Sequence, residues 1–214
     1  MKIYIFRALL GVSLLTTVMS TSAQKTYSEG IVTYKTTMGG QDVEVKEYFR
    51  ADSNAATYTV GQATITVLSD AGNKSFAILL DVPQAKIKKA AIMTPDEIEQ
   101  ATNALPSFTF APGTEMKQIS GFKCKKVVAT DTKDKKTYEL WITNDVTVPS
   151  TAIPPYYKQA GGFPVQYTIF QQGQSSNVTV SSVTDQKAPV GTFAIAADFD
   201  KITMSDLKAL SGRN

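Results

Sequence analysis

The chain contains no histidine, and this absence excludes several mechanisms at once. Ser-His-Asp and Cys-His catalysis both use an imidazole as the base. Histidine-based zinc sites are excluded for the same reason, and the single cysteine, Cys124, supplies neither a thiolate cluster nor an internal disulfide. Cys124 is therefore expected to be a small buried apolar residue, because free cysteines commonly take that place.

Sequence motifs for bound cofactors are also missing. No glycine-rich loop follows a strand and opens a helix, so neither phosphate-cradling motif is present. No Asp-x-Asp-x-Asp-Gly run marks a calcium loop. We therefore expect no cofactor, no metal and no enzymatic activity. Carboxylates remain for any catalysis, but no spacing marks a pair among Asp70, Asp81, Glu115, Glu139 and Asp145.

The first 23 residues have the pattern of a cleavable signal peptide. Positive charges at Lys2 and Arg7 precede an apolar core over residues 8–19, and small residues then lead to a predicted cleavage site near Ala23/Gln24. This core is shorter than the roughly 20 apolar residues of a membrane-spanning helix. The protein is therefore predicted to be periplasmic or secreted after cleavage.

Removal of this segment lowers the formal net charge from +3 to about +1, because Lys2 and Arg7 are its only charged residues. A nearly neutral chain argues against a nucleic-acid partner, which would require a strongly basic surface. The cleavage region contains no cysteine that could carry a lipid. We therefore expect no stable membrane anchor.

Residues 24–214 are predicted to form a single, mainly β (α+β) domain. Apolar and polar residues alternate, most clearly over 42–50, and turn residues recur about every ten positions. About ten short sequential strands favour a curved antiparallel sheet or an incomplete β-barrel. Residues 108–113 are expected to form a connector between two halves of this sheet.

Two helices are expected within this β domain. Thr94, Pro95 and Glu97 together provide a capping residue, a proline suited to the first turn and the acid of a capping box, which predicts one central helix. Residues 203–210 are expected to form a short C-terminal helix.

Two groups of lysines stand out and have two interpretations. Alternation places Lys86 and Lys88 on one face of a strand, and Lys123 and Lys125 on one face of another. They could form a basic rim that meets anionic lipid headgroups. The alternative is a solvated strand face whose lysines discourage edge-to-edge aggregation.

Aromatic residues in irregular segments are the candidate ligand site. A curved sheet covered by one helix and by the proline-rich stretch 147–164 could enclose an apolar cavity, the usual form of a small-molecule site. Ordinary core packing is the alternative. The candidate ligand-binding residues are Phe108, Phe110, Trp141, Tyr156, Tyr157 and Phe163.

The second half of the chain resembles a known family. An I-x-G-x-K-C pattern at residues 119–124 is followed by x-W-x-T at 140–143, Pro-Pro-Tyr at 154–156 and Gly-Gly-Phe-Pro at 161–164. This resembles a family of uncharacterised exported proteins of Gram-negative bacteria, a domain of unknown function. That family is similar in architecture to the periplasmic lipoprotein carriers, in which an incomplete barrel wraps around helices and holds an acyl chain. The resemblance implies a lipoprotein-carrier-like domain over 24–214 and brings no catalytic residues.

Three functions remain open at this point. The first is a non-enzymatic protein that binds a hydrophobic ligand, a lipid or the acyl chain of a lipoprotein. The second is an envelope structural or interaction module that meets a partner protein through its surface. The third is a carboxylate glycan hydrolase, which requires two carboxyl groups converging in one cleft.

Overall fold

A computed structural model describes residues 24–72, 74–171 and 174–210. The predicted signal peptide lies outside these residues. The elements in chain order are β1 (Lys25–Thr26), β2 (Gly30–Met38), β3 (Gln41–Arg50), β4 (Ser53–Val60), β5 (Ala63–Asp70), β6 (Phe76–Val82), η1 (Pro83–Ala85), β7 (Ile87–Ile92), α1 (Pro95–Asn103), β8 (Phe108–Ile119), β9 (Phe122–Asp131), β10 (Thr137–Thr143), β11 (Val146–Thr147), η2 (Ser150–Ala152), η3 (Pro155–Tyr157), β12 (Phe163–Gln171), β13 (Gln174–Thr184), β14 (Asp200–Ile202) and α2 (Met204–Leu210).

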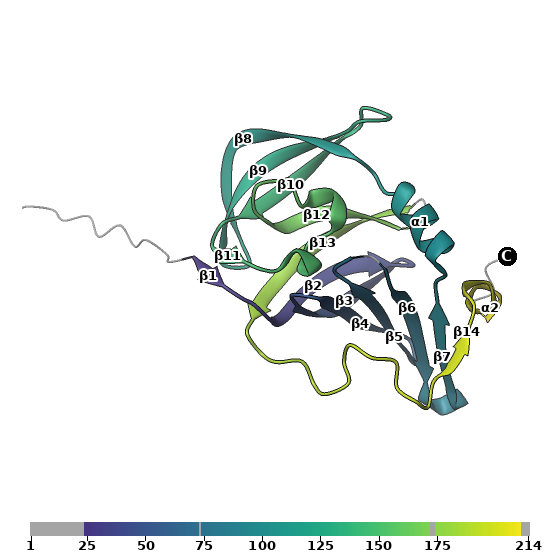
Figure 1. Ribbon diagram of the computed structural model, residues 1–214. Coiled ribbons are helices and arrows are strands. Elements are labelled where there is room, and N and C mark those ends of the chain that lie inside the picture. The colour runs from purple at the N-terminus through teal and green to yellow at the C-terminus, as the bar shows by residue number, and fades with distance from the viewer. Residues whose placement is uncertain (1–23, 73, 172–173, 211–214) are drawn as a thin grey trace, which may run out of the picture.

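Twelve of the strands form one large curved sheet that does not close into a barrel (Figure 1). Their order is β14-β7-β6-β5-β4-β3-β2-β13-β12-β10-β9-β8. All neighbours are antiparallel except β7 and β14, which run parallel. The predicted fold class, mainly β with a central and a C-terminal helix, is confirmed.

The strand β8 corrects one prediction. Residues 108–113 are the start of a 12-residue strand rather than a connector. The pairing with β9 shifts register between Pro112 and Met116, which hid the strand from a search for regular alternation. Proline is tolerated here because β8 is the last strand in the sheet, where a missing N–H leaves no ladder bond unmade.

A long-range seam joins the two parts of the sheet. β2 pairs on one side with β3 through the turn at Gly39 and Gly40, which both have positive φ as such a turn requires. On its other side β2 pairs with β13, which lies more than a hundred residues later. Gly30 sits at the end of this seam, where a Cβ atom would overlap the carbonyl oxygen of Thr184.

Helix α1 connects β7 to β8, which lie near opposite ends of the strand order (Figure 1). Its capping box is complete: the Thr94 side chain accepts from the Glu97 N–H, and the Glu97 carboxylate accepts from the Thr94 N–H at 2.8 Å. All of α1 is described, and none of its residues is buried. Neither helix in the described part of the chain is long and apolar enough to cross a membrane.

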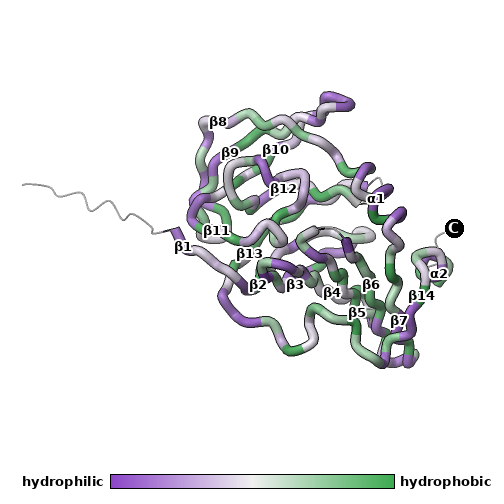
Figure 2. Tube along the Cα trace, viewed as in Figure 1, coloured by the Kyte–Doolittle hydropathy of each residue, from purple (hydrophilic) through white to green (hydrophobic). Residues whose placement is uncertain are grey.

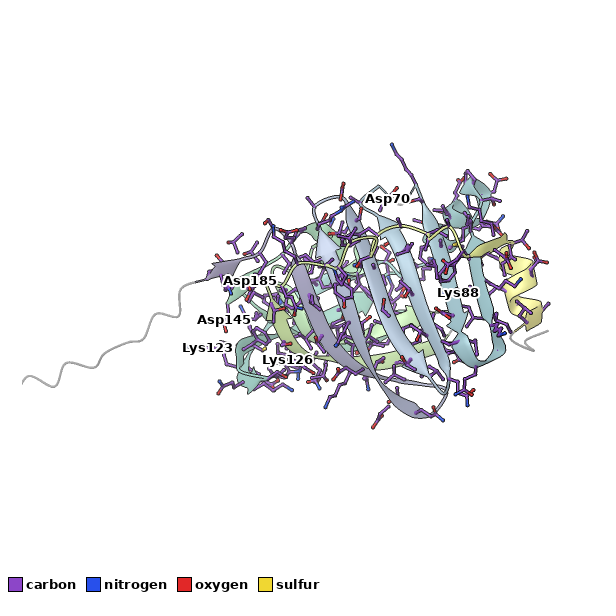
Figure 3. All side chains as sticks on the ribbon, turned by 90° about the horizontal axis from the view of Figure 1, so that it is seen from below. Asp70, Lys88, Lys123, Lys126, Asp145 and Asp185 are labelled. Atoms are coloured by element: carbon purple, nitrogen blue, oxygen red, sulfur yellow. The ribbon has the colours of Figure 1, made fainter. Side chains whose placement is uncertain are left out.

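Two irregular segments cover opposite faces of the sheet. Residues 148–162, here called the inner segment, lie within the curve and contain η2 and η3 (Figure 1). Residues 185–199, the outer segment, cross the convex side of the strands and lead into β14 (Figure 3). The inner segment is the proline-rich stretch expected to cover the sheet.

The inner segment is anchored to the concave face by polar and aromatic contacts. The Asn54 amide donates to the Thr151 carbonyl oxygen at 2.9 Å. Tyr157 is 1% exposed, and its ring stacks on Phe108 with centroids 5.6 Å apart. Its hydroxyl donates to the Thr168 carbonyl oxygen at 2.8 Å. This segment therefore fills the curve next to β8, β12 and the start of β4.

The outer segment is fixed to the convex face by apolar contacts and ion pairs. Phe193, Ile195 and Phe199 pack against a small cluster of buried side chains on β4–β7. Lys88 on β7 lies 2.8 Å from Asp198 and 3.4 Å from Asp81 (Figure 3). The convex side of β4–β7 is thereby covered.

Candidate functional site

The concave face of β4–β7 carries apolar side chains that remain partly open to solvent. Residues paired directly across neighbouring strands share a face. One such row runs Ala56, Val67, Ile78, Ala91, and the next runs Tyr58, Ile65, Leu80, Lys89. Six of the seven uncharged members are half-buried, Ala91 being the buried one. Figure 2 shows the hydrophobic residues recurring along β5, β6 and β7.

The opposite face of the same strands gives the contrast. Ala55, Leu68 and Ala77 form one row on the convex side and are 0%, 9% and 6% exposed. The outer segment covers them. Apolar strand faces are usually buried in this way. The half-exposed concave rows are therefore the unusual feature of these strands.

Glu47 extends the first concave row beyond its apolar members. It pairs with Ala56 on β4 and with Val32 on β2, so its side chain shares their face. One carboxylate oxygen accepts from the Asn54 amide. Burial raises the pKa of Glu47 to about 7, and the hydrogen bond from Asn54 only partly opposes this shift. A carboxyl group that titrates near neutrality therefore lies at the end of an apolar row.

Tyrosine hydroxyls surround this carboxyl group. Tyr34 on β2 and Tyr167 on β12 both interact with Glu47, and burial is the main cause that raises their pKa values well above the usual range. Tyr156 on η3 lies near both, and burial raises its pKa to about 12. These hydroxyls stay protonated at neutral pH, so Glu47 is the group there that changes charge.

Four of the six predicted ligand residues do meet in one place. Phe108, Phe110, Tyr156 and Tyr157 form a single aromatic cluster. Tyr138, Tyr167 and Phe170 complete it, with Tyr138 and Phe170 rings 5.0 Å apart. The cluster fills the part of the curve that the inner segment occupies. Edge-to-face contacts dominate it, as in a packed core.

The other two predicted residues lie elsewhere. Trp141 is 6% exposed, and the Lys117 ammonium lies 4.0 Å from its ring centroid. In the pairing of β10 with β12, Trp141 lies opposite Gln166. The Gln166 side-chain oxygen accepts a hydrogen bond from the Lys117 ammonium at 2.9 Å. Phe163 is 3% exposed and belongs to the main core. Neither ring contacts the aromatic cluster through a ring–ring pair among the described residues.

Helix α1 lines one side of a surface pocket. The residues that line this pocket are not those expected of an acyl-binding cavity. The pocket has a volume of about 540 Å³ and opens to solvent between α1 and the β5–β6 turn. Its lining includes the polar side chains of Lys74, Glu99, Thr102 and Asn103. The pocket beside α1 is therefore not the enclosed apolar cavity that was expected beneath this helix.

The predicted lysine groups make ion pairs. Lys89 lies 2.9 Å from Asp200, and Lys126 lies 2.8 Å from Glu115 and 2.7 Å from Glu139. Lys123 sits beside Asp145, whose carboxylate accepts from the Lys123 backbone N–H (Figure 3). Within the described ranges no group of three or more acidic or thiol side chains is placed to hold a metal ion. Cys124 is buried, as expected, and burial raises its pKa to about 11.

Comparison with known proteins gives a fold and no family. No protein-family model matches the chain, and no curated protein sequence matches it either. Among solved structures, the chain is similar to PNGF-II in two crystal forms. The form in space group C2 has 16% identity and a TM-score of 0.50 over 85% of this chain and 32% of that one. The form in space group P21 has 15% identity and a TM-score of 0.51 over 86% of this chain and 33% of that one.

These likenesses establish architecture alone. At such identities the shared fold carries no residue roles. The chain also spans only about a third of the length of the PNGF-II chains it matches. The site must therefore be argued from its own geometry.

Sequence reasoning missed Glu47, although a signal was present. The apolar positions of β3 are Val43, Val45 and Phe49, and Glu47 takes the place between the last two. A charged residue at an apolar position of an alternating strand marks either an error in the pattern or a buried polar group. Here it marks a partly buried carboxyl group.

Proposed function

We propose that this protein binds a hydrophobic ligand on the concave face of β4–β7 and is not an enzyme. The ligand class is a lipid or the acyl chain of a lipoprotein. The observation that carries the proposal is the difference between the two faces of the same strands. The convex rows are covered by the outer segment, whereas the concave rows Ala56–Val67–Ile78 and Tyr58–Ile65–Leu80 are only half-buried.

The dimensions of this face suit an elongated ligand. Neighbouring strands lie about 4.8 Å apart, so a row across β4–β7 is roughly 14 Å long. An acyl chain lying on these side chains would remove their apolar surface from water. This burial favours binding by about 25 cal/mol of free energy per Å² of apolar surface. The open side of the curve leaves this face accessible without any strand separating from its neighbour.

The proposed location is the periplasm or the extracellular space, following the predicted signal peptide. Intact-mass measurement of the exported protein tests this directly, with a mature chain starting at Gln24 as the expected result. A protein retained with residues 1–23 attached in the cytoplasmic fraction would contradict it.

A carboxylate glycan hydrolase is the less favoured function. Glu47 has the raised pKa that a general acid needs. Such hydrolases use a second carboxyl group about 5–9.5 Å away. Burial and Asn54 are the causes of the Glu47 shift, and no second carboxyl group of the described chain is among them. A surface interaction module also accounts for the filled aromatic cluster and would use an exposed apolar patch. We favour the ligand because the half-exposed rows lie on the concave face of the sheet, where an elongated molecule can lie along the curve.

Binding of a fluorescent fatty-acid probe, together with native mass spectrometry of gently purified protein, tests the proposed function. Leu80→Glu places a charge in the middle of the second concave row, and we expect it to weaken probe binding at least tenfold. Val190→Glu is the matched control, because Val190 is fully exposed in the outer segment. Equal binding by both variants, or no binding and no co-purified lipid with the unmodified protein, would show the proposal to be wrong.

A further inference from the structure

The first concave row is polar at one end and apolar along the rest. It runs Glu47, Ala56, Val67, Ile78, Ala91 over β3 to β7. Four strand spacings separate its ends, which is about 19 Å. The apolar members lie on the strands toward the β7–β14 end of the sheet, and the carboxyl group lies toward its middle. The row therefore suits a ligand with a polar group at one end and an apolar body along the rest.

The Glu47 carboxyl group has little to bind within the protein. Asn54 donates to one of its oxygens, and the same amide also donates to the Thr151 carbonyl oxygen. Tyr34 and Tyr167 are further neighbours of Glu47 and interact with it electrostatically. None of the ion pairs in the described chain includes it. A carboxylate in such surroundings lacks its natural complement, a cation.

The titratable groups that face Glu47 cannot supply that cation. They are the hydroxyls of Tyr34 from β2 and Tyr167 from β12, and Tyr156 from η3 and Tyr58 from β4 lie next to Tyr34. Asn54 on β4 is a neutral amide. Lys89 also lies on the concave face, but on β7, where it pairs with Asp200 at 2.9 Å. A positive charge that pairs with Glu47 would therefore have to come from outside the described chain.

We propose that the ligand of this face is a cationic amphiphile whose ammonium group pairs with Glu47 and whose apolar body lies along Ala56, Val67 and Ile78. The inference rests on the proposed hydrophobic-ligand function and names the ligand class for it. An ammonium group would replace water around the carboxylate with a charge-assisted hydrogen bond, which is stronger than a neutral one. The raised pKa of Glu47 fits this, because the hydrogen bond from Asn54 favours the ionised form but does not offset the effect of burial.

Three single-chain probes of equal length separate this inference from the function it rests on: dodecylammonium, dodecanol and dodecanoate. Calorimetric titration, at concentrations where each probe is dissolved as single molecules, would use the unmodified protein, Glu47→Gln and Glu44→Gln. Glu44 is the matched control, because it is exposed on the same strand and points to the other face. At pH 8 we expect dodecylammonium to bind at least about tenfold more tightly than dodecanol. Glu47→Gln should lose this preference, and Glu44→Gln should keep it.

The pH dependence gives a readout that does not need a variant. Lowering the pH from 8 to 5.5 protonates Glu47 and should reduce the preference for dodecylammonium severalfold, because the tyrosines and the probe's amine do not titrate in this range. Equal affinity for dodecanol and dodecylammonium at pH 8, or tightest binding of dodecanoate, would overturn the cationic ligand and leave the hydrophobic-ligand function standing. Binding of none of the three probes would overturn both.

Discussion

The two parts of the sheet are covered on opposite faces. Around β8, β9, β10, β12 and β13 the concave side is filled by the inner segment, and an aromatic cluster occupies the space. Across β4–β7 it is the convex side that is covered, by the outer segment, and the concave rows stay half-exposed. Alternating burial occurs in both parts, in β6 as in β13. The difference shows that the placement of irregular segments, rather than the strand pattern, decides which face is available.

Tyr157→Ala should have the largest effect, because it removes the most buried ring of the inner segment. Tyr157 is 1% exposed and contacts both Phe108 and Tyr167. Loss of a buried aromatic ring leaves a cavity and should lower the free energy of unfolding by about 3–5 kcal/mol. Urea unfolding measures this. A loss under about 1 kcal/mol would mean that the inner segment is not part of the core.

Glu47→Gln should stabilise the protein at high pH, and this tests whether the open part carries a costly group. The ordinary pKa of the carboxyl is 4.5 and its value in the folded protein is about 7, so the folded state holds more protons between these values. Stability contributed by the protonated group is therefore present below pH 4.5 and is lost as the pH rises through 7. At pH 8 the free energy of unfolding of the variant should exceed that of the unmodified protein by roughly 1–3 kcal/mol. This range allows for the partial exposure of the Glu47 side chain.

The same comparison about one unit below the ordinary pKa of 4.5, near pH 3.5, is the control, since Glu47 is then largely neutral in both states and the gain in stability should shrink toward zero. Thermal or urea unfolding at the two pH values measures it. A gain of equal size at both values would mean that charge is not the cause.

Phe193→Ala tests whether the outer segment holds the other part together. The Phe193 ring packs on the buried convex cluster and lies under the Arg50 guanidinium, 4.5 Å from it. Because the ring is only partly buried, the expected loss is about 1–2 kcal/mol. Val190→Ala in the same segment removes a fully exposed side chain and should change nothing measurable. Equal effects of the two variants would contradict the assignment.

Thr94→Ala should have the smallest effect. It removes the side chain that caps α1, the connection between the two ends of the sheet, and should cost about 0.5–2 kcal/mol. Because α1 buries none of its residues, the loss should appear as faster hydrogen exchange over 95–103 with little change elsewhere. Faster exchange throughout β7 and β8 would show instead that the helix supports both strands.

Local features of the fold were predictable from the sequence, and distant ones were not. Alternation over 42–50 and the Thr94–Glu97 capping box involve residues within one turn or one strand, where chain geometry decides the outcome. The pairing of β2 with β13 joins residues far apart in the chain, and no local signal encodes it. The strand β8 was missed because Pro112 and Gly113 interrupt its alternation.

The site was predictable in part for the same reason. Phe108, Phe110, Tyr156 and Tyr157 were expected together and do meet, since both segments carry dense aromatic residues. These four side chains bury one another because the inner segment lies on the concave face. Strand alternation assigns residues to faces but does not indicate which face another segment covers. Trp141 and Phe163 were placed with them on residue type alone, and neither joins the cluster. Glu47 broke the pattern of β3 and was the more informative residue.

The seam between β2 and β13 also sets the order of assembly. The strands β2–β7 follow one another through short turns, so their pairing closes only small loops. The seam must close a loop of more than a hundred residues, the slowest kind of contact to form. The main core, which draws on Val32 and Phe49 from the first part and Val178 and Val180 from β13, cannot complete before this closure. We therefore expect folding to proceed from an early β2–β7 meander to a late closure, with the pairing of β13 limiting the rate.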